Sequence, residues 1–143
     1  MILIMDFVYK RPINYYETDK MGIVHHSNYI RFLEEARGYY FDELNMPFVE
    51  YEKNNVTIPV LGVNCTYKHH VTYGDTLLIK VFIKKYNGVR LTVSYDVRDE
   101  KTNETVIIAE TKHCFTNIDL KPINLKKYIP EFHEKFEKLS KIV

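Results

Sequence analysis

Apolar residues recur every three or four positions after position 28, which is the spacing of one face of an amphipathic helix. Charged residues such as Glu34 and Arg37 fall on the other face. Ser27 or Asn28 is suited to cap the first turn, and Pro47 marks the far limit. The pattern predicts one long helix whose apolar face consists of Tyr29, Phe32, Leu33, Ala36, Tyr40 and Leu44.

Beyond Thr57 apolar residues alternate with other residues, which is typical of strands with one buried face. The dipeptide Asn87-Gly88 between two such runs predicts a hairpin with a two-residue type I′ turn. A further long strand is expected in "TVIIAETKHCFTNI", which follows the polar turn "DEKTNE". The alternating positions are Leu61, Val63, Cys65 and Tyr67 in the first run, Leu77, Ile79, Val81 and Ile83 in the second, and Leu91, Val93, Tyr95 and Val97 in the third.

Two more elements complete the expected order. A strand is expected near residues 4 to 16, and a lysine-rich helix with Pro130 in its first turn is expected at the C-terminus. A long helix lying across a curved antiparallel sheet would bury the apolar faces of both, so the fold class is α+β. No repeat or linker interrupts the chain, so we expect one domain over residues 1–143. The apolar face of the terminal helix consists of Ile129, Phe132, Phe136 and Leu139.

Composition and charge exclude several classes of function. The chain has 143 residues, 45% of them hydrophobic, which suits one core. Its formal charge of +1 gives no electrostatic footprint for nucleic acid or an anionic membrane. No apolar run approaches the length that spans a bilayer, and the start is shorter than a signal-peptide core, so we expect a cytoplasmic protein without stable membrane insertion. Cys65 and Cys114 are expected to be buried free thiols.

The stretch "YYETDKMGIVHHSNYIR" holds the candidate chemistry. Asp19 follows the first expected strand in a loop that Gly22 can turn sharply, and the helix begins about eight residues later. The carboxylate and the helix N-terminus can therefore face one pocket. Unpaired N–H groups at a helix start can stabilise an oxyanion, and a carboxylate beside them suffices for acyl transfer to water. The alternative is that Asp19 only caps a turn.

The histidine pairs suggest no metal site. His25 and His26 are adjacent on an expected extended segment, so their side chains should point to opposite sides, and the same holds for His69 and His70. No metal-ligand spacing, glycine-rich phosphate loop or nucleophile elbow occurs in the sequence. We expect neither a metal nor a cofactor.

The stretch from Tyr15 to Arg37 resembles the N-terminal signature of the 4-hydroxybenzoyl-CoA thioesterase family, which includes the acyl-CoA thioesterases associated with the Tol-Pal system. The resemblance continues through "IPVLGVNCTYKHHVTYGDTLLIKV" and covers about residues 6 to 120. His70 departs from it, because many members carry a proline there. The matching positions are Tyr15, Thr18, Asp19, Gly22, Ile23, Val24, His26, Asn28, Tyr29, Phe32, Glu34, Ala36 and Arg37.

The resemblance implies a hotdog fold, a curved antiparallel sheet around one long central helix, and it implies site roles. Asp19 would be the catalytic carboxylate, acting as nucleophile or as general base, and the backbone N–H of His26 would polarise the thioester carbonyl. Tyr15 and the His26 side chain would orient the substrate or the acid, with simple packing as their alternative. The implied substrate-binding positions are Gly22, Ile23, Val24 and Asn28.

The predicted function is an acyl-CoA thioesterase that hydrolyses a small or medium acyl-CoA to a free acid and CoA. The resemblance also implies a homo-oligomer, a dimer joined edge to edge through its sheets with the sites at the interface, and commonly a tetramer. One alternative is a hotdog hydratase or dehydratase, although its usual Asp-x-x-x-x-His spacing does not match Asp19 and His26. Another is a non-catalytic acyl-CoA-binding module. The acyl group stays open, as do the CoA-phosphate ligands, for which Lys68, Lys84, Lys85 and Arg90 are candidates.

Overall fold

The computed structural model describes residues 7–142. It contains five strands and four α-helices within these residues, and a short 3-10 turn precedes the first helix. The elements are β1 (Val8–Pro12), the 3-10 turn (Tyr15–Glu17), α1 (Ser27–Glu43), α2 (Phe48–Lys53), β2 (Val60–Tyr67), β3 (Thr76–Tyr86), β4 (Arg90–Asp99), β5 (Thr105–Cys114), α3 (Leu125–Tyr128) and α4 (Pro130–Ser140).

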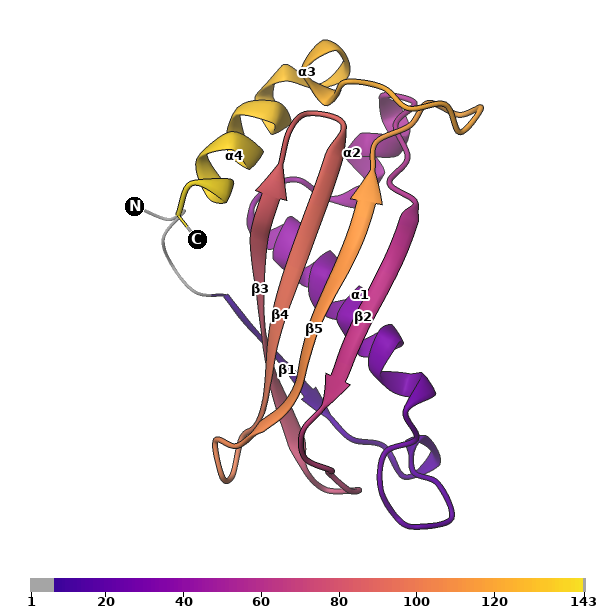
Figure 1. Cartoon of the computed structure of the whole chain (residues 1–143), viewed down its shortest axis with the longest axis vertical. Coiled ribbons are helices and arrows are strands. Elements are labelled where there is room, and N and C mark those ends of the chain that lie inside the picture. Colours follow the sequence, from indigo (N-terminus) through magenta and orange to yellow (C-terminus); the bar gives the residue numbers. More distant parts are fainter. Residues whose placement is uncertain (1–6, 143) are drawn as a thin grey trace.

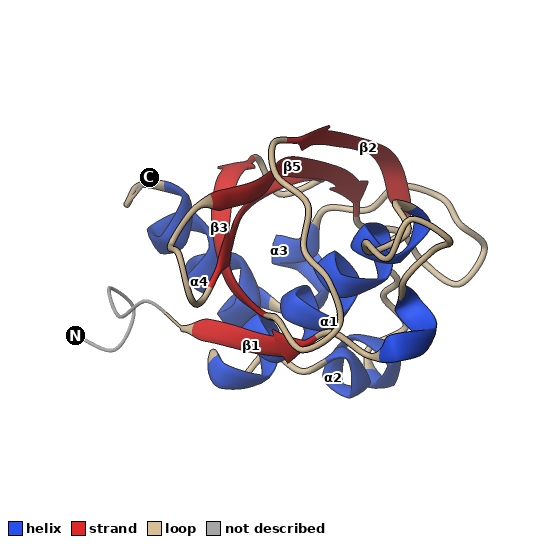
Figure 2. Ribbon diagram, turned by 90° about the horizontal axis from the view of Figure 1, so that it is seen from below, coloured by secondary structure: helices blue, strands red, loops and turns tan. Residues whose placement is uncertain are grey.

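The five strands form one antiparallel sheet in the order β1-β3-β4-β5-β2. The sheet curves around α1, which lies along its concave side (Figures 1 and 2). α4 packs against β3 near the end of the sheet where α3 also lies (Figure 1). This is the α+β arrangement predicted from the sequence, and it is the hotdog architecture that the resemblance implied.

The apolar face predicted for the long helix is confirmed. All six of its residues are buried, and Leu33 and Ala36 are completely inaccessible. The inward positions predicted for β3 and β4 are also buried, so helix and sheet share one core. Complete burial of each large aliphatic or aromatic side chain contributes about 1.5 to 3 kcal/mol. Pro130 occupies the first turn of α4, as expected.

The prediction of one buried face was wrong for β2. Leu61 is 50% exposed, Val63 41% and Tyr67 51%. The strand lies at the edge of the sheet, paired with β5 on one side only, and in the described part of the chain nothing pairs with its other side. Alternation along the sequence marks a strand but does not distinguish an edge strand from a central one.

Several local predictions need correction. Only part of the expected first strand is strand: β1 ends at Pro12, since the N–H of Asn14 bonds the Glu17 carboxylate as the 3-10 turn begins, and residues 4–6 lie outside the described residues. The last strand stops at Cys114, because Thr116 instead bridges Thr57 and Pro122. The helix α1 begins at Ser27 with His26 as its N-cap residue, so neither expected cap is used.

The hairpin between β3 and β4 forms, but its turn differs from the expected one. The Asn87 N–H donates to the Arg90 carbonyl, so Gly88 and Val89 are the central residues. Gly88 has φ 94°, and Asn87 is not in the positive-φ region, which excludes the type I′ turn. The Asn87 side chain instead accepts hydrogen bonds from the N–H groups of Val89 and Arg90, 3.0 and 2.7 Å away.

A chain of hydrogen bonds crosses the core. Arg37 Nη1 donates to Tyr95 Oη over 2.9 Å, Tyr95 Oη lies 2.7 Å from Thr111 Oγ1, and Thr111 Oγ1 lies 2.7 Å from His113 Nε2. All four residues are buried, which corrects the placement of Arg37 on the polar face of the helix. His113 Nδ1 has no hydrogen-bond partner among the described residues. The charged guanidinium of Arg37 is thus buried beside uncharged hydrogen-bonding groups.

His113 should make the protein sensitive to acid. Burial, with a further contribution from the Arg37 charge, lowers the pKa of His113 to about 4. The unfolded chain then binds a proton that the folded chain does not, so this stability is complete above the ordinary pKa of about 6.5 and is lost as the pH falls through that value toward the folded pKa. We expect this residue to lower the free energy of unfolding by about 2 to 3 kcal/mol between pH ~7.5 and pH ~4.5.

The measurement is urea unfolding at the two pH values, for the wild type and for His113→Gln. Glutamine keeps a partner for Thr111 but does not titrate in this range. The variant should lose less stability on acidification than the wild type by that amount. Equal acid sensitivity in the two proteins would show that His113 is not the titrating group.

Candidate active site

The loop that carries Asp19 is fixed at both ends. The Asp19 N–H donates to the Ile23 carbonyl and the Gly22 N–H donates to the Asp19 carbonyl, over 2.8 and 2.9 Å. Gly22 has φ 82°, a conformation that glycine adopts without strain. Thr72 Oγ1 donates to the Gly22 carbonyl over 2.6 Å, and the Val24 N–H donates to the Val71 carbonyl. The loop is therefore held against the segment that leads into β3.

Asp19 both caps this turn and offers an oxygen to solvent. Its Oδ1 accepts a hydrogen bond from the Met21 N–H over 2.8 Å, so the turn-capping alternative is part of the structure. Its Oδ2 accepts no hydrogen bond from any residue that the structure describes. One carboxylate oxygen thus fixes the side chain, and the other is free to act on a ligand.

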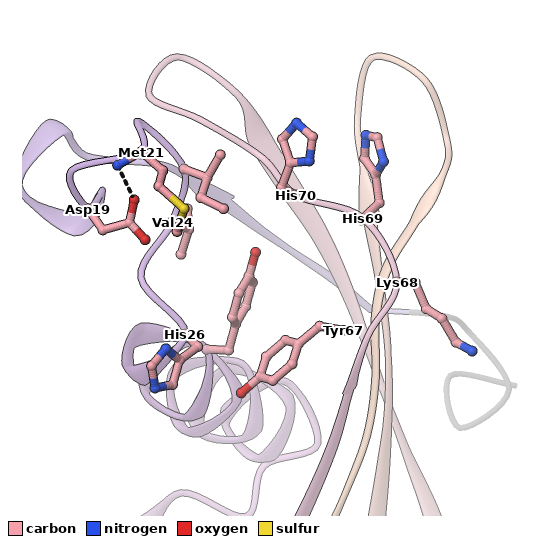
Figure 3. A pocket seen from close by; sticks show the side chains of 10 residues that line it. Asp19, Met21, Val24, His26, Tyr67, Lys68, His69 and His70 are labelled. Atoms are coloured by element: carbon pink, nitrogen blue, oxygen red, sulfur yellow. Dashed lines mark hydrogen bonds between the residues drawn. The ribbon is translucent and has the colours of Figure 1, made fainter.

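Asp19 lines a cavity of about 360 Å³. Figure 3 shows the Asp19 loop facing the segment of His69 and His70 across this cavity, with His26 at the start of α1 below. The lining is mixed in character, because it includes aliphatic side chains, two tyrosines, three histidines, a lysine and the Asp19 carboxylate. Its lining residues are Asp19, Met21, Ile23, Val24, His26, Tyr29, Tyr67, Lys68, His69 and His70.

The first turn of α1 supplies the electropositive side of the site. The backbone N–H of His26 donates to no acceptor among residues 7–142. α1 is 17 residues long, so the partial positive charge of its N-terminus is fully developed next to the cavity. An unpaired N–H and a free carboxylate oxygen at one cavity match what hydrolysis of an acyl group requires.

The structure places the other predicted site residues in different roles. Ile23 and Val24 line the cavity, whereas Gly22 shapes the loop. Asn28 is not among the lining residues; its Nδ2 donates to the Glu17 carbonyl over 2.9 Å and so ties α1 to the 3-10 turn. Tyr15 is 75% exposed and lies outside the cavity. Among the aromatic residues that the structure describes, its ring contacts only that of Tyr73, in an edge-on arrangement.

The rings of His25 and His26 stack, with centroids 4.3 Å apart, so the expectation that they point to opposite sides was wrong. His26 has helical backbone angles, and the segment is therefore not extended. His69 and His70 also stack, 5.0 Å apart. Within the described residues, no group of three or more His, Cys, Asp or Glu side chains lies close enough to hold a metal ion.

Tyr29 lines the cavity and contacts Tyr67, with ring centroids 5.6 Å apart. Burial raises the pKa of Tyr29 to about 12. Its phenol therefore stays protonated at neutral pH, which makes it a hydrogen-bond donor and not a base. Of the described residues that line the cavity, only Asp19 has a carboxylate.

The ion pair that supports the loop was not predicted from the sequence. Arg11 donates two hydrogen bonds to the buried Glu17 carboxylate, over 2.8 and 2.5 Å, and a third to Glu35 over 2.8 Å. The Glu17 backbone carbonyl also accepts the N–H of His25. Glu17 lies two positions before Asp19. The only feature of the sequence that could have indicated its burial is a basic residue on the preceding strand.

Neutralising Glu17 should loosen this support. In Glu17→Gln the Arg11 charge would lose its buried partner, and we expect the free energy of unfolding to fall by about 3 kcal/mol, the scale for breaking a buried ion pair. Glu35→Gln is the matched control, because Glu35 binds the same guanidinium from a more exposed position and should cost below about 1 kcal/mol. Urea unfolding compares them, and equal losses would show that Glu17 has no special role.

The comparisons with known proteins agree on one family. Residues 13–137 match the sequence model of a protein family described as the thioesterase-like superfamily. YneP of Bacillus subtilis (strain 168), a candidate acyl-CoA thioesterase by its name, is 34% identical over 130 residues, which are 90% of this chain and 94% of that protein. The chain therefore belongs to the thioesterase-like superfamily.

Two further relatives have named substrates. A 1,4-dihydroxy-2-naphthoyl-CoA hydrolase of Prochlorococcus marinus is 26% identical over 144 residues, which are 94% of this chain and 91% of that protein. A crystal structure of a DHNA-CoA thioesterase from Staphylococcus aureus superposes with a TM-score of 0.90 and 30% identity, and it covers 96% of this chain and 92% of that one.

No helix among the described residues is long and apolar enough to cross a membrane.

Proposed function

We propose that the protein is an acyl-CoA thioesterase, which converts a small or medium acyl-CoA and water into a carboxylic acid and CoA. The observation that carries the proposal is that Asp19, with one free carboxylate oxygen, and His26, with an unpaired backbone N–H, both line one cavity. The superfamily membership and the names of the relatives from Bacillus subtilis and Staphylococcus aureus support the same activity.

In the proposed reaction the thioester carbonyl accepts a hydrogen bond from the His26 N–H. Acting as general base, Asp19 takes a proton from water while the water oxygen bonds to the acyl carbon, and the N–H stabilises the oxyanion that forms. Collapse of this intermediate breaks the carbon–sulfur bond. The thiolate of CoA leaves and takes up the proton from Asp19. Alternatively, Asp19 attacks the carbon directly, and water then hydrolyses the resulting anhydride.

We place the protein in the 4-hydroxybenzoyl-CoA thioesterase family on the signature between Tyr15 and Arg37. A cytoplasmic location is part of the proposal, since both cysteines are free thiols, as is usual in a reducing compartment. Cys114 is buried and Cys65 is half-buried. No metal or redox cofactor takes part in the proposed reaction.

A panel of acyl-CoA esters assayed for thiol release tests the activity. Saturated substrates should release CoA, and the preferred chain length or ring should appear as the highest kcat/KM. A hydratase would instead add water to an unsaturated acyl-CoA and leave the thioester intact, and a binding module would retain CoA esters without turnover. Either result would replace the thioesterase proposal.

The proposal includes a homodimer joined through β2. This edge strand contains no charged residue and no proline over Val60–Tyr67, and the side chains of Val60, Leu61, Val63 and Tyr67 are 41 to 51% exposed. The opposite edge, β1, has the protection usual for a free edge, with Lys10, Arg11 and Pro12. A second copy related by a twofold axis would pair with β2 without bringing like charges together. Two such dimers would form the tetramer that the resemblance implies.

A further inference from the structure

The backbone N–H groups at the start of α1 are paired within the chain, with one exception. The N–H of His25 donates to the Glu17 carbonyl over 2.9 Å, and that of Asn28 donates to the His25 carbonyl over 3.0 Å. The N–H of Ser27 donates to His25 Nδ1 over 3.2 Å. The N–H of His26 has no acceptor within residues 7–142, and a helix offers none to its own first N–H groups. The fold thus leaves one donor of this segment for a ligand in the cavity that His26 lines.

One carbonyl oxygen, that of Glu17, binds the chain on both sides of His26. It accepts the N–H of His25 before that residue and the side-chain Nδ2 of Asn28 after it, each over 2.9 Å. A carbonyl oxygen has two lone pairs, so both hydrogen bonds can form together. Asn28 does not line the cavity, and its amide is directed at the Glu17 carbonyl. The backbone of His26 is therefore fixed between two contacts to the same atom.

The Glu17 carbonyl is a firm anchor for these contacts. The Glu17 side chain is buried and accepts two hydrogen bonds from Arg11, which fixes the 3-10 turn. Asp19 follows only two residues later along the chain. The Asp19 carboxylate and the His26 N–H are thus both placed relative to Glu17, the first along the chain and the second through hydrogen bonds. Misplacement of a reacting group by about 1 Å can cost roughly 10² in rate, so a bond that fixes this separation affects catalysis.

We propose, on the basis of the thioesterase function above, that Asn28 is a positioning residue. Its bond to the Glu17 carbonyl holds the His26 N–H where the oxyanion forms. Asn28 does not touch the thioester and acts only through the backbone of His26, which differs from the substrate-binding role that the resemblance implied. An oxyanion binds such a donor more strongly than the carbonyl of the substrate does, so the effect of Asn28 falls on kcat and not on KM.

Asn28→Ala removes the side-chain bond and leaves every residue that lines the cavity in place. Thiol release from acyl-CoA esters should show kcat lowered by roughly 10 to 10², up to the scale for loss of an oxyanion donor. KM should change by less than about twofold, because ground-state contacts are retained. An unchanged kcat, or a rise in KM that accounts for the whole loss of kcat/KM, would overturn the proposal.

Asn54→Ala is the matched control. Asn54 Nδ2 also donates to a backbone carbonyl, that of Glu50 over 2.8 Å, but it does so at the end of α2 and does not line the cavity. The variant loses the same kind of hydrogen bond and should keep the kcat and KM of the wild type. A loss of kcat equal to that of Asn28→Ala would show that any such bond matters equally, and the proposal would fail.

Asn28→Asp keeps the experiment decisive if the alanine variant does not fold. Aspartate has nearly the size of asparagine, and its charge favours the first turn of a helix, so this variant should fold. Its side chain has no N–H donor, and two oxygens would face each other at the Glu17 carbonyl. We expect kcat to fall at least as far as in Asn28→Ala. Far-ultraviolet circular dichroism verifies the fold, and wild-type kcat in a folded Asn28→Asp would overturn the proposal.

Infrared spectroscopy of a bound analogue reports the position of the donor itself. In the analogue a methylene group replaces the thioester sulfur, so that an isotope-labelled ketone stands in for the thioester carbonyl and cannot be hydrolysed. Binding to the wild type should move its carbonyl stretch to lower frequency, because the His26 N–H donates to the oxygen. Asn28→Ala should bind the analogue but lose most of this shift. Equal shifts in the two proteins, or no shift in the wild type, would overturn the proposal. A wild type that shows the shift but releases no thiol from any ester would instead overturn the proposed function.

Discussion

Asp19→Asn should lower kcat for thioester hydrolysis by a factor of roughly 10² or more, the usual scale for loss of a general base. The amide keeps the shape of the side chain and an oxygen that can accept the Met21 N–H, so the loop should keep its conformation. It cannot take a proton from water or attack carbon. The measurement is thiol release under saturating acyl-CoA, and binding of the CoA ester should be retained.

Asp99→Asn is the matched control for this change. Asp99 Oδ1 accepts the Lys101 N–H over 3.0 Å, as Asp19 Oδ1 accepts that of Met21, but Asp99 lies in another turn and does not line the Asp19 cavity. The control should keep wild-type kcat. His26→Ala leaves the backbone N–H in place and should cost much less than Asp19→Asn. If His26→Ala abolished activity and Asp19→Asn retained it, the imidazole would be the catalytic group and a hydratase would become the better assignment.

Val63→Lys should abolish oligomerisation and strongly reduce activity. Val63 lies in the middle of β2 with its side chain 41% exposed, and a twofold axis there would bring the two lysines together in the interface. We expect the species in solution to become a 17.1 kDa chain by light scattering, with kcat/KM reduced by roughly 10² because the resemblance places each active site at the dimer interface.

The control for the edge is Ile142→Lys, which adds the same charge at a position of similar exposure, 52%, beyond α4. It should keep the oligomer and the activity of the wild type. A wild-type protein that is monomeric and fully active, or a monomeric Val63→Lys variant with unchanged kcat/KM, would contradict an active site at the dimer interface.

Local periodicity was sufficient to predict the main elements of the fold. Burial of the Phe32 face of α1 and of the alternate residues of β3 and β4 follows from side-chain direction alone, so these predictions are confirmed. The position of β2 at the sheet edge depends on strand order, which alternation does not determine. Arg37 falls on the charged side of the helix by spacing, yet it is buried because the chain after α1 returns to cover that side.

Only the part of the candidate site that is local in the sequence could be predicted. Asp19, Gly22 and the start of α1 lie within a dozen residues, so local spacing brings them together. The opposite wall, with Tyr67 and His69, comes from a segment some fifty residues later and depends on the curvature of the sheet. The buried Glu17 depends on Arg11 from β1, and no periodic pattern identifies such a pair.

Turnover in water labelled with heavy oxygen shows whether this chain breaks the thioester of acyl-CoA with water. We expect CoA and free acid to appear in equal amounts, with the heavy oxygen in the carboxyl group of the acid. Heavy oxygen on the carbon chain of an intact CoA ester would contradict this expectation and indicate a hydratase, and the absence of both products would indicate a binding protein.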